Sequence, residues 1–186
     1  LSADGFLGLS VRSLTQFNAS QLSVLSTDQI KTLNFQQIGT IGTAEISNWS
    51  SSQVGALSTR YLDALTTASL ASLNSAQLPG LTTAQMVALT VEQSAIITAT
   101  QVPFLSTAQI VAMEVRDFVK LSTAAIQALT TNQISGITTA QIQGMTTAQL
   151  VAMETHDIAK LTTAQIVALT EEQIPKLTTA QIQALT

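Results

Sequence analysis

An eight-residue unit repeats through this chain from its first residue, without insertion or deletion. Cutting every eight residues from Leu1 divides the 186 residues into 23 complete octads with two residues over. Position 1 of the octad is apolar in all 23, and position 6 is apolar in 22, with Ser94 as the exception. Such regularity predicts a repeat array in which each unit buries its apolar residues only by stacking on its neighbours.

The period of eight excludes the two simplest structures. In one continuous α-helix, each octad would rotate the apolar pair by about 80°, so no single face would stay apolar. In a flat strand, positions 1 and 6 would lie on opposite faces because an odd number of residues separates them. The chain must therefore change direction within each octad.

The polar positions of the octad indicate that a helix starts in each one. Position 2 is Ser, Thr or Asn in 20 of 23 octads, and position 5 is Gln or Glu in 16. This spacing is typical of the capping box, in which the N-cap side chain accepts from the N3 backbone N–H and the N3 side chain reaches back to the N-cap N–H. Positions 1 and 6 are then the two partners of a hydrophobic staple. The phrase LTTAQI thus predicts a helix start.

Charges and prolines indicate that each helix is short, covering about positions 3 to 8. Ten of the 11 acidic residues lie at positions 2 to 5, where a helix dipole favours them, and Asp63 is the exception. Pro79, Pro103 and Pro175 all occupy position 7, where proline removes an intrahelical hydrogen bond. We expect some octads to hold a single turn, and such helices need stacking to be stable.

The predicted fold is an all-α solenoid of very short capped helices, one per octad. A β-solenoid is the alternative, because Thr-rich repeats of low charge can form ladders in such folds. The capping box and the scarcity of Gly and Asp at turn positions favour the helical fold. We expect residues 1–186 to form one continuous solenoid, with degenerate repeats over 1–72 and more regular repeats over 73–186.

Composition narrows the classes of partner. Only 10% of the residues are charged, the formal net charge is −4, and Lys and Arg form no run. Nucleic acids and anionic membranes are therefore poor candidates for partners. No apolar run approaches the roughly 20 residues of a membrane span, and the absence of cysteine excludes disulfides and thiolate metal sites. Because the chain opens on Leu1, we expect a segment or a processed product.

Carboxylates in a longer repeat are the only candidates for a metal site. Two stretches that lie forty residues apart, 105–128 and 145–168, match at 14 of 24 positions. If five octads closed a whole number of superhelical turns, four acids would align in a row that binds Ca²⁺ or a partner. These acids are Glu114, Asp117, Glu154 and Asp157. We favour the simpler interpretation, in which the aspartates interact with the helix dipole.

Catalytic and cofactor sites are not expected. His156 is the only histidine, and we interpret it as a solvated helix position. Ser94 interrupts the apolar pattern beside Ile96 and Ile97, which suggests local repacking rather than a buried nucleophile. The sequence holds no Gly-rich phosphate loop and no nucleophile elbow. We therefore expect no enzyme, no catalytic residue and no cofactor.

Two resemblances to known families follow from these motifs. LTTAQIVALT resembles the first-helix segment of TAL-effector repeats, but those repeats are longer, basic and carry a base-reading pair without a counterpart here, so DNA binding does not follow. Runs such as LTTAQIQGMTTAQLVAMETHDIAKLTTAQIVALT are similar to octad tracts of very large secreted bacterial proteins described as adhesin-like or RTX-like. That resemblance implies a cell-surface or biofilm role in which the repeats form an extended stalk.

The expected function is a non-enzymatic structural repeat region, an extracellular stalk or filament-forming segment of a bacterial surface protein. Its expected partners are neighbouring repeats or other copies of the chain, stacked end to end. The alternative is a binding module that presents rows of Thr, Ser and Gln to a repetitive ligand such as a polysaccharide or ice.

Overall fold

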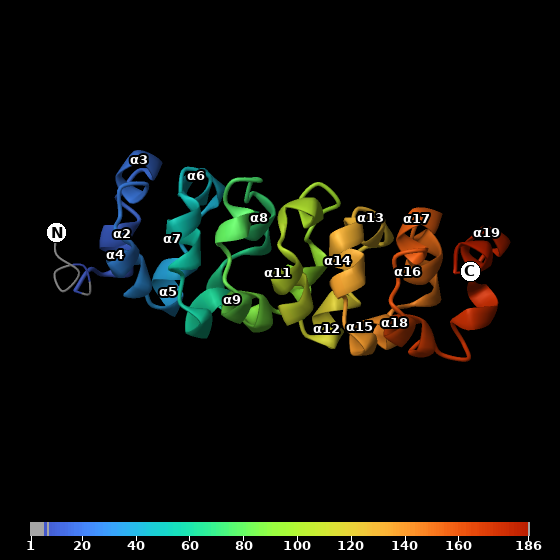
Figure 1. Ribbon diagram of the computed structural model, residues 1–186. Coiled ribbons are helices and arrows are strands. Elements are labelled where there is room, and N and C mark those ends of the chain that lie inside the picture. The colour runs from blue at the N-terminus through green and yellow to red at the C-terminus, as the bar shows by residue number, and fades with distance from the viewer. Residues whose placement is uncertain (1–5, 7, 186) are drawn as a thin grey trace. The chain divides into compact units, whose positions relative to one another are not determined.

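The computed structural model describes residue 6 and residues 8–185 (Figure 1). All regular structure in that part of the chain is helical, with one short helix in every octad from the second to the last. The predicted all-α solenoid of capped helices is confirmed, and the β-solenoid alternative is wrong, because the described residues form no strand. Most of the first octad and Thr186 lie outside the described residues, so the helix start expected there is not described.

The chain divides into two compact units, residues 1–93 and 94–186. The first unit holds α2 (Val11–Leu14), α3 (Ala19–Leu22), α4 (Thr27–Lys31), α5 (Phe35–Ile38), α6 (Thr43–Ile46), α7 (Ser51–Gly55), η1 (Thr59–Ala64), α8 (Thr67–Ala71), η2 (Leu78–Gly80) and α9 (Thr83–Ala88). Helix α10 (Val91–Ala95) contains the boundary.

The second unit continues the same succession of short helices. It holds η3 (Val102–Phe104), α11 (Thr107–Ala112), α12 (Val115–Phe118), α13 (Thr123–Gln127), α14 (Thr131–Gly136), α15 (Thr139–Gly144), α16 (Thr147–Ala152), α17 (Thr155–Ile158), α18 (Thr163–Val167), η4 (Ile174–Lys176) and α19 (Thr179–Ala184). The elements labelled η are 3₁₀-helices.

The predicted caps explain why the chain turns into a new helix every eight residues. Before α15, the Thr138 hydroxyl accepts from the Gln141 backbone N–H at 3.1 Å, and Oε1 of Gln141 accepts from the Thr138 N–H at 3.0 Å. Thr138 itself is extended, with φ −71° and ψ 155°. The N-cap residue therefore ends the preceding segment while its side chain satisfies the first N–H groups of the next helix.

The three prolines shorten their helices as expected. Pro79, Pro103 and Pro175 lie within η2, η3 and η4, each a 3₁₀-helix of 3 residues. A proline at position 7 has no N–H for an α-helical bond, so the octad ends in a tighter turn. Element η1 is also a 3₁₀-helix but contains no proline.

Three octad positions build the core of each unit. Positions 1 and 6 are buried as predicted in most octads, for example in Ile137 (3% exposed) and Ile134 (0%), but Ile174 (48%) and Ile182 (44%), both at position 6, are exposed. Position 5 is buried as well, and here the side chain is polar: Gln133 is 2% exposed and Gln141 is 1% exposed. The sequence predicted position 5 as a capping residue, but it did not predict its burial.

Helices three octads apart pack against one another, so three octads make one turn of the solenoid. The packed helices form three columns in each unit. In the first unit the columns are α2–α5–η1–α9, α3–α6–α8 and α4–α7–η2. In the second unit they are α11–α14–α17–α19, α12–α15–α18 and α13–α16.

Candidate functional site

The glutamine at position 5 links successive turns of the solenoid. In α15, Nε2 of Gln141 donates to the carbonyl oxygens of Ile110 and Met113, at 3.0 Å each, while its Oε1 caps its own helix. Ile110 and Met113 lie 31 and 28 residues earlier, where one octad of the preceding turn passes into the next. One side-chain amide therefore hydrogen-bonds with a backbone N–H at the start of its own helix and with backbone carbonyls at the end of a helix in the preceding turn. We call this arrangement the Gln bridge.

The Gln bridge recurs with nearly constant register within both units. Its acceptors lie 28 residues earlier and, in most cases, 31 residues earlier as well. Glutamines that make it are Gln37, Gln53, Gln77, Gln85 and Gln93 in the first unit, and Gln133, Gln141, Gln149, Gln165, Gln173 and Gln181 in the second.

Other residues at position 5 alter the bridge. The Ser69 hydroxyl donates to the Ile41 carbonyl at 2.9 Å, which keeps the bond 28 residues back. Ala125 is fully buried and has no side-chain polar atom. Asp117 and Asp157 place a carboxyl at this position, and both side chains are almost completely buried, at 0% and 1% exposure. These two octads differ from the others described in that they bury a carboxyl at position 5.

The octad of Asp157 surrounds the buried carboxyl with two further titratable groups. Nδ1 of His156 lies 3.1 Å from Oε2 of Glu154, and its Nε2 lies 3.3 Å from Oδ1 of Asp157. Burial raises the pKa of the Asp157 carboxyl; nearby His156 opposes this rise and Glu154 adds to it. His156 is 60% exposed, so it occupies the solvated position that the sequence predicted and also contacts both acids.

The octad of Asp117 has the same plan with an arginine at position 4. Nε of Arg116 lies 2.8 Å from Oε2 of Glu114 and 3.7 Å from Oδ2 of Asp117. In both octads a glutamate replaces the usual N-cap hydroxyl, and neither glutamate side chain caps its helix. A basic side chain at position 4 thus accompanies each buried aspartate.

The two acidic pairs do not align in space. Five octads make one and two-thirds turns, because the packing helices are three octads apart. Helix α12, with Asp117, and α17, with Asp157, accordingly belong to different columns. The condition for a carboxylate row of Glu114, Asp117, Glu154 and Asp157 is therefore not met. Within residues 6 and 8–185, no three His, Cys, Asp or Glu side chains are grouped to hold a metal ion.

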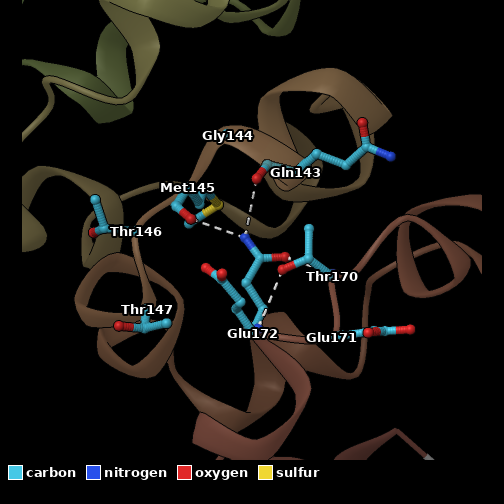
Figure 2. Close-up of a pocket in the computed structure, with 9 residues that line it drawn as sticks. Gln143, Gly144, Met145, Thr146, Thr147, Thr170, Glu171 and Glu172 are labelled. Atoms are coloured by element: carbon cyan, nitrogen blue, oxygen red, sulfur yellow. Dashed lines mark hydrogen bonds between the residues drawn. The ribbon is translucent and has the colours of Figure 1, made fainter.

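A hollow of about 680 Å³ opens between the octads of Met145 and Leu169 (Figure 2). Threonines 146, 147 and 170 line it together with Gln143, Gly144, Met145, Glu171, Glu172 and Gln173. Figure 2 shows the Glu172 carboxylate directed toward Met145, whereas Glu171 points away. On one side of the hollow, Nε2 of Gln173 donates to the carbonyl oxygens of Gln143 and Met145, at 3.4 and 2.8 Å. The hollow therefore offers hydroxyl and carboxylate oxygens to a polar ligand.

Ser94, the one polar residue at position 6, is fully buried. Its hydroxyl has no hydrogen-bond partner among the described residues. Trp49 at position 1 is 3% exposed and belongs to the core, as the sequence predicted.

These octads match a known family of repeats. The ALTTAQ repeat model matches residues 59–91, 110–147 and 150–186, which together make up more than half of the chain. The chain belongs to the ALTTAQ repeat family. Its matched segments contain most of the glutamines that make the Gln bridge, and two of these, Gln165 and Gln181, lie in the exact phrase LTTAQI. No curated protein matches the sequence. No helix of the described part is long and apolar enough to cross a membrane.

Proposed function

We propose that this ALTTAQ repeat chain is a non-enzymatic structural region, the stalk or filament-forming segment of a bacterial surface protein. The Gln bridge carries the proposal. Each turn presents backbone carbonyls to the next turn, and each next turn supplies amides at the same register. A fold with this property extends by adding turns, which is what a spacer requires.

The surface of the octads supports the same proposal. Outside the core positions, the side chains are mostly Thr, Ser, Ala and Gln, and few are charged. Such a surface is mostly polar, and its chemistry varies little along the array. An extracellular location agrees with the similarity of these octads to tracts of large secreted bacterial proteins. The same carbonyls could accept hydrogen bonds from the amides of a second copy, so self-association would occur by end-to-end stacking.

The length of the particle tests the stalk proposal. We would duplicate residues 137–160 once and twice, adding one and two turns of three octads each. Each added turn should lengthen the particle by roughly 8–10 Å, the spacing of packed helices, as measured by small-angle X-ray scattering. A maximum dimension that does not grow with the number of turns would contradict the proposal.

Location and self-association need separate measurements. Antibodies against the chain should label intact cells of the producing organism as strongly as permeabilised cells; labelling only after permeabilisation would refute an extracellular role. Sedimentation velocity should show a mass that rises with protein concentration. A constant monomer mass at all concentrations would remove end-to-end stacking and leave the stalk proposal standing.

The hollow between the octads of Met145 and Leu169 supports a second candidate, a binding module for a polysaccharide. Hydroxyls of Thr146, Thr147 and Thr170 and the carboxylate of Glu172 are the kinds of group that bind sugar hydroxyls. Replacing Glu172 with Gln and Thr147 with Val should weaken retention on a polysaccharide affinity gel. The matched variant Thr123→Val changes an exposed threonine outside the hollow. Equal retention of all variants would exclude the hollow as the site.

A further inference from the structure

The octad of Asp157 places a carboxyl where the neighbouring octads of its column place an amide. Gln133 and Gln181 occupy position 5 in α14 and α19, on either side of α17, and their amides donate to two and three backbone carbonyls of the preceding turn, respectively. Asp157 is equally buried, at 1% exposure. Its Oδ1 makes no hydrogen bond with the described residues, although Nε2 of His156 lies 3.3 Å from it. This position therefore lacks the donor that the column otherwise supplies.

The register of the Gln bridge identifies what faces the carboxyl. Acceptors for position 5 lie 28 and 31 residues earlier in the chain, as they do for Gln165 and Gln173. By the same register, we infer that the carbonyls opposite Asp157 are those of Leu129 and Ile126. An ionised carboxylate and a carbonyl oxygen are both acceptors, so they repel each other, whereas a protonated carboxyl has an O–H that donates. The buried site therefore favours the neutral acid.

Few charged groups act on Asp157. On its own octad these are Glu154 and His156, with Lys160 exposed at the end of the octad. Helices α14 and α19, which pack against α17, contain no titratable side chain. From α13, the amide of Gln127 lies 3.5 Å from Oε1 of Glu154. Glu154 and His156 are therefore the charged side chains that lie closest to the Asp157 carboxyl.

We propose that Asp157 is a proton-dependent contact between turns of the solenoid. When its carboxyl binds a proton, the O–H donates to a carbonyl of the preceding turn, at Leu129 or Ile126, in place of the Gln amide. When the proton leaves, the carboxylate has no O–H to donate to those carbonyls, and the packing of α17 against α14 loosens. This contact thus contributes more to the stability of the second unit in mild acid than at neutral pH.

The direction of the pH effect follows from linkage. Burial raises the pKa of Asp157 above its ordinary value of 3.8, so the folded state binds this proton more tightly than the unfolded state. Its stabilising contribution is complete below the unfolded pKa and is lost as the pH rises through the folded pKa. An exposed carboxylate in an ion pair has the opposite effect, because its folded pKa is lowered.

Hydrogen exchange of the full chain tests the proposal. Amide protection in α14 and α17, corrected for intrinsic exchange, should fall as the pH rises from about 4 to about 8. Asp157→Gln supplies the residue of the neighbouring octads, so its protection should not change with pH and should exceed that of the parent chain at neutral pH. Unchanged pH dependence in Asp157→Gln would overturn the proposal.

Two further variants identify the titrating group. Glu171→Gln removes an exposed carboxylate from the same unit and should retain the full loss of protection. His156→Gln should also retain it, with the loss shifted to higher pH, because His156 lowers the pKa of Asp157. If His156→Gln abolished the pH dependence, His156 would be the titrating group and the assignment to Asp157 would be wrong.

Discussion

A single glutamine side chain at position 5 closes hydrogen bonds in two directions. Its carbonyl oxygen accepts from the N-cap of its own helix, and its amide nitrogen donates to the preceding turn. The free backbone groups at the ends of such short helices are numerous relative to their length. Because the amide is buried, each bond it makes replaces one that water can no longer provide. Stability of the array therefore depends on a polar residue inside the core.

Removing one Gln bridge should destabilise the chain much more than removing an exposed glutamine of the same helix. Gln141→Ala loses two bonds to carbonyls and one from the Thr138 N–H, and we expect a loss of about 2–4 kcal/mol. Gln143→Ala, two residues further along α15 and exposed, should change stability by less than about 0.5 kcal/mol. Urea unfolding followed by circular dichroism measures both; similar losses would mean that the bridge is energetically unimportant.

The sequence predicted only the local half of this arrangement. The capping box joins residues three apart, such as Thr138 and Gln141, so its spacing is visible in every octad. The bonds to the preceding turn join residues 28 and 31 apart, a distance that depends on the number of octads per turn. A signal was nevertheless present, because a capping residue on a solvated surface need not be Gln so consistently. One buried Gln side chain both caps its own helix and donates to the preceding turn. This double role explains why position 5 is so consistently Gln.

At the level of the elements, close approach between successive turns requires a small residue at individual sites. Gly80 in η2 packs so closely on α7 that a Cβ at this position would overlap the backbone carbonyl of Ser51. Backbone cannot move aside as a flexible side chain can. In contrast, a Cβ on Gly39 would lie 3.5 Å from its nearest atom, the Phe35 carbonyl oxygen, which is an ordinary contact.

Alanine at these two glycines should have opposite effects. Gly80→Ala should lower the free energy of unfolding by about 2–3 kcal/mol, because it forces η2 away from α7. Gly39→Ala should be neutral or stabilise by about 0.5 kcal/mol, since its φ of −61° suits alanine and the unfolded chain loses freedom. Thermal and urea unfolding of the two variants provide the comparison. A neutral Gly80→Ala would show that η2 and α7 leave room for a methyl group between Gly80 and Ser51.

At the level of the whole chain, the number of octads in one turn cannot be read from the sequence, because the octads are nearly identical. Any number of octads per turn keeps positions 1 and 6 in the core, so the period alone predicts a solenoid without its circumference. The resemblance of residues 105–128 to 145–168 suggested a unit of five octads. Packing instead selects three, because that spacing brings the amides at position 5 to the open carbonyls. The sequence repeat and the structural repeat therefore differ.

Insertions of different length test whether the unit of stability is the single octad or the turn of three octads. Duplicating residues 137–160 adds three octads, or one turn, and should preserve or raise the free energy of unfolding, since every downstream column keeps its pairing. Duplicating residues 137–144 adds one octad, which keeps the octad frame and the Gln bridges but packs each downstream helix on a different column. That mismatch should cost about 1–3 kcal/mol in repacking.

An insertion of half an octad after Lys160 provides the strongest disruption. It moves the apolar positions of every later octad out of register, so α18 and α19 should lose their amide protection entirely in hydrogen exchange. The variant with three added octads should therefore be the most stable, followed by the one-octad variant and then the half-octad variant. If the one-octad variant matched the three-octad variant, each octad would be an interchangeable unit and the columns would carry no specificity. If the half-octad variant matched both, stacking through the bridge at position 5 would not be what holds the turns together.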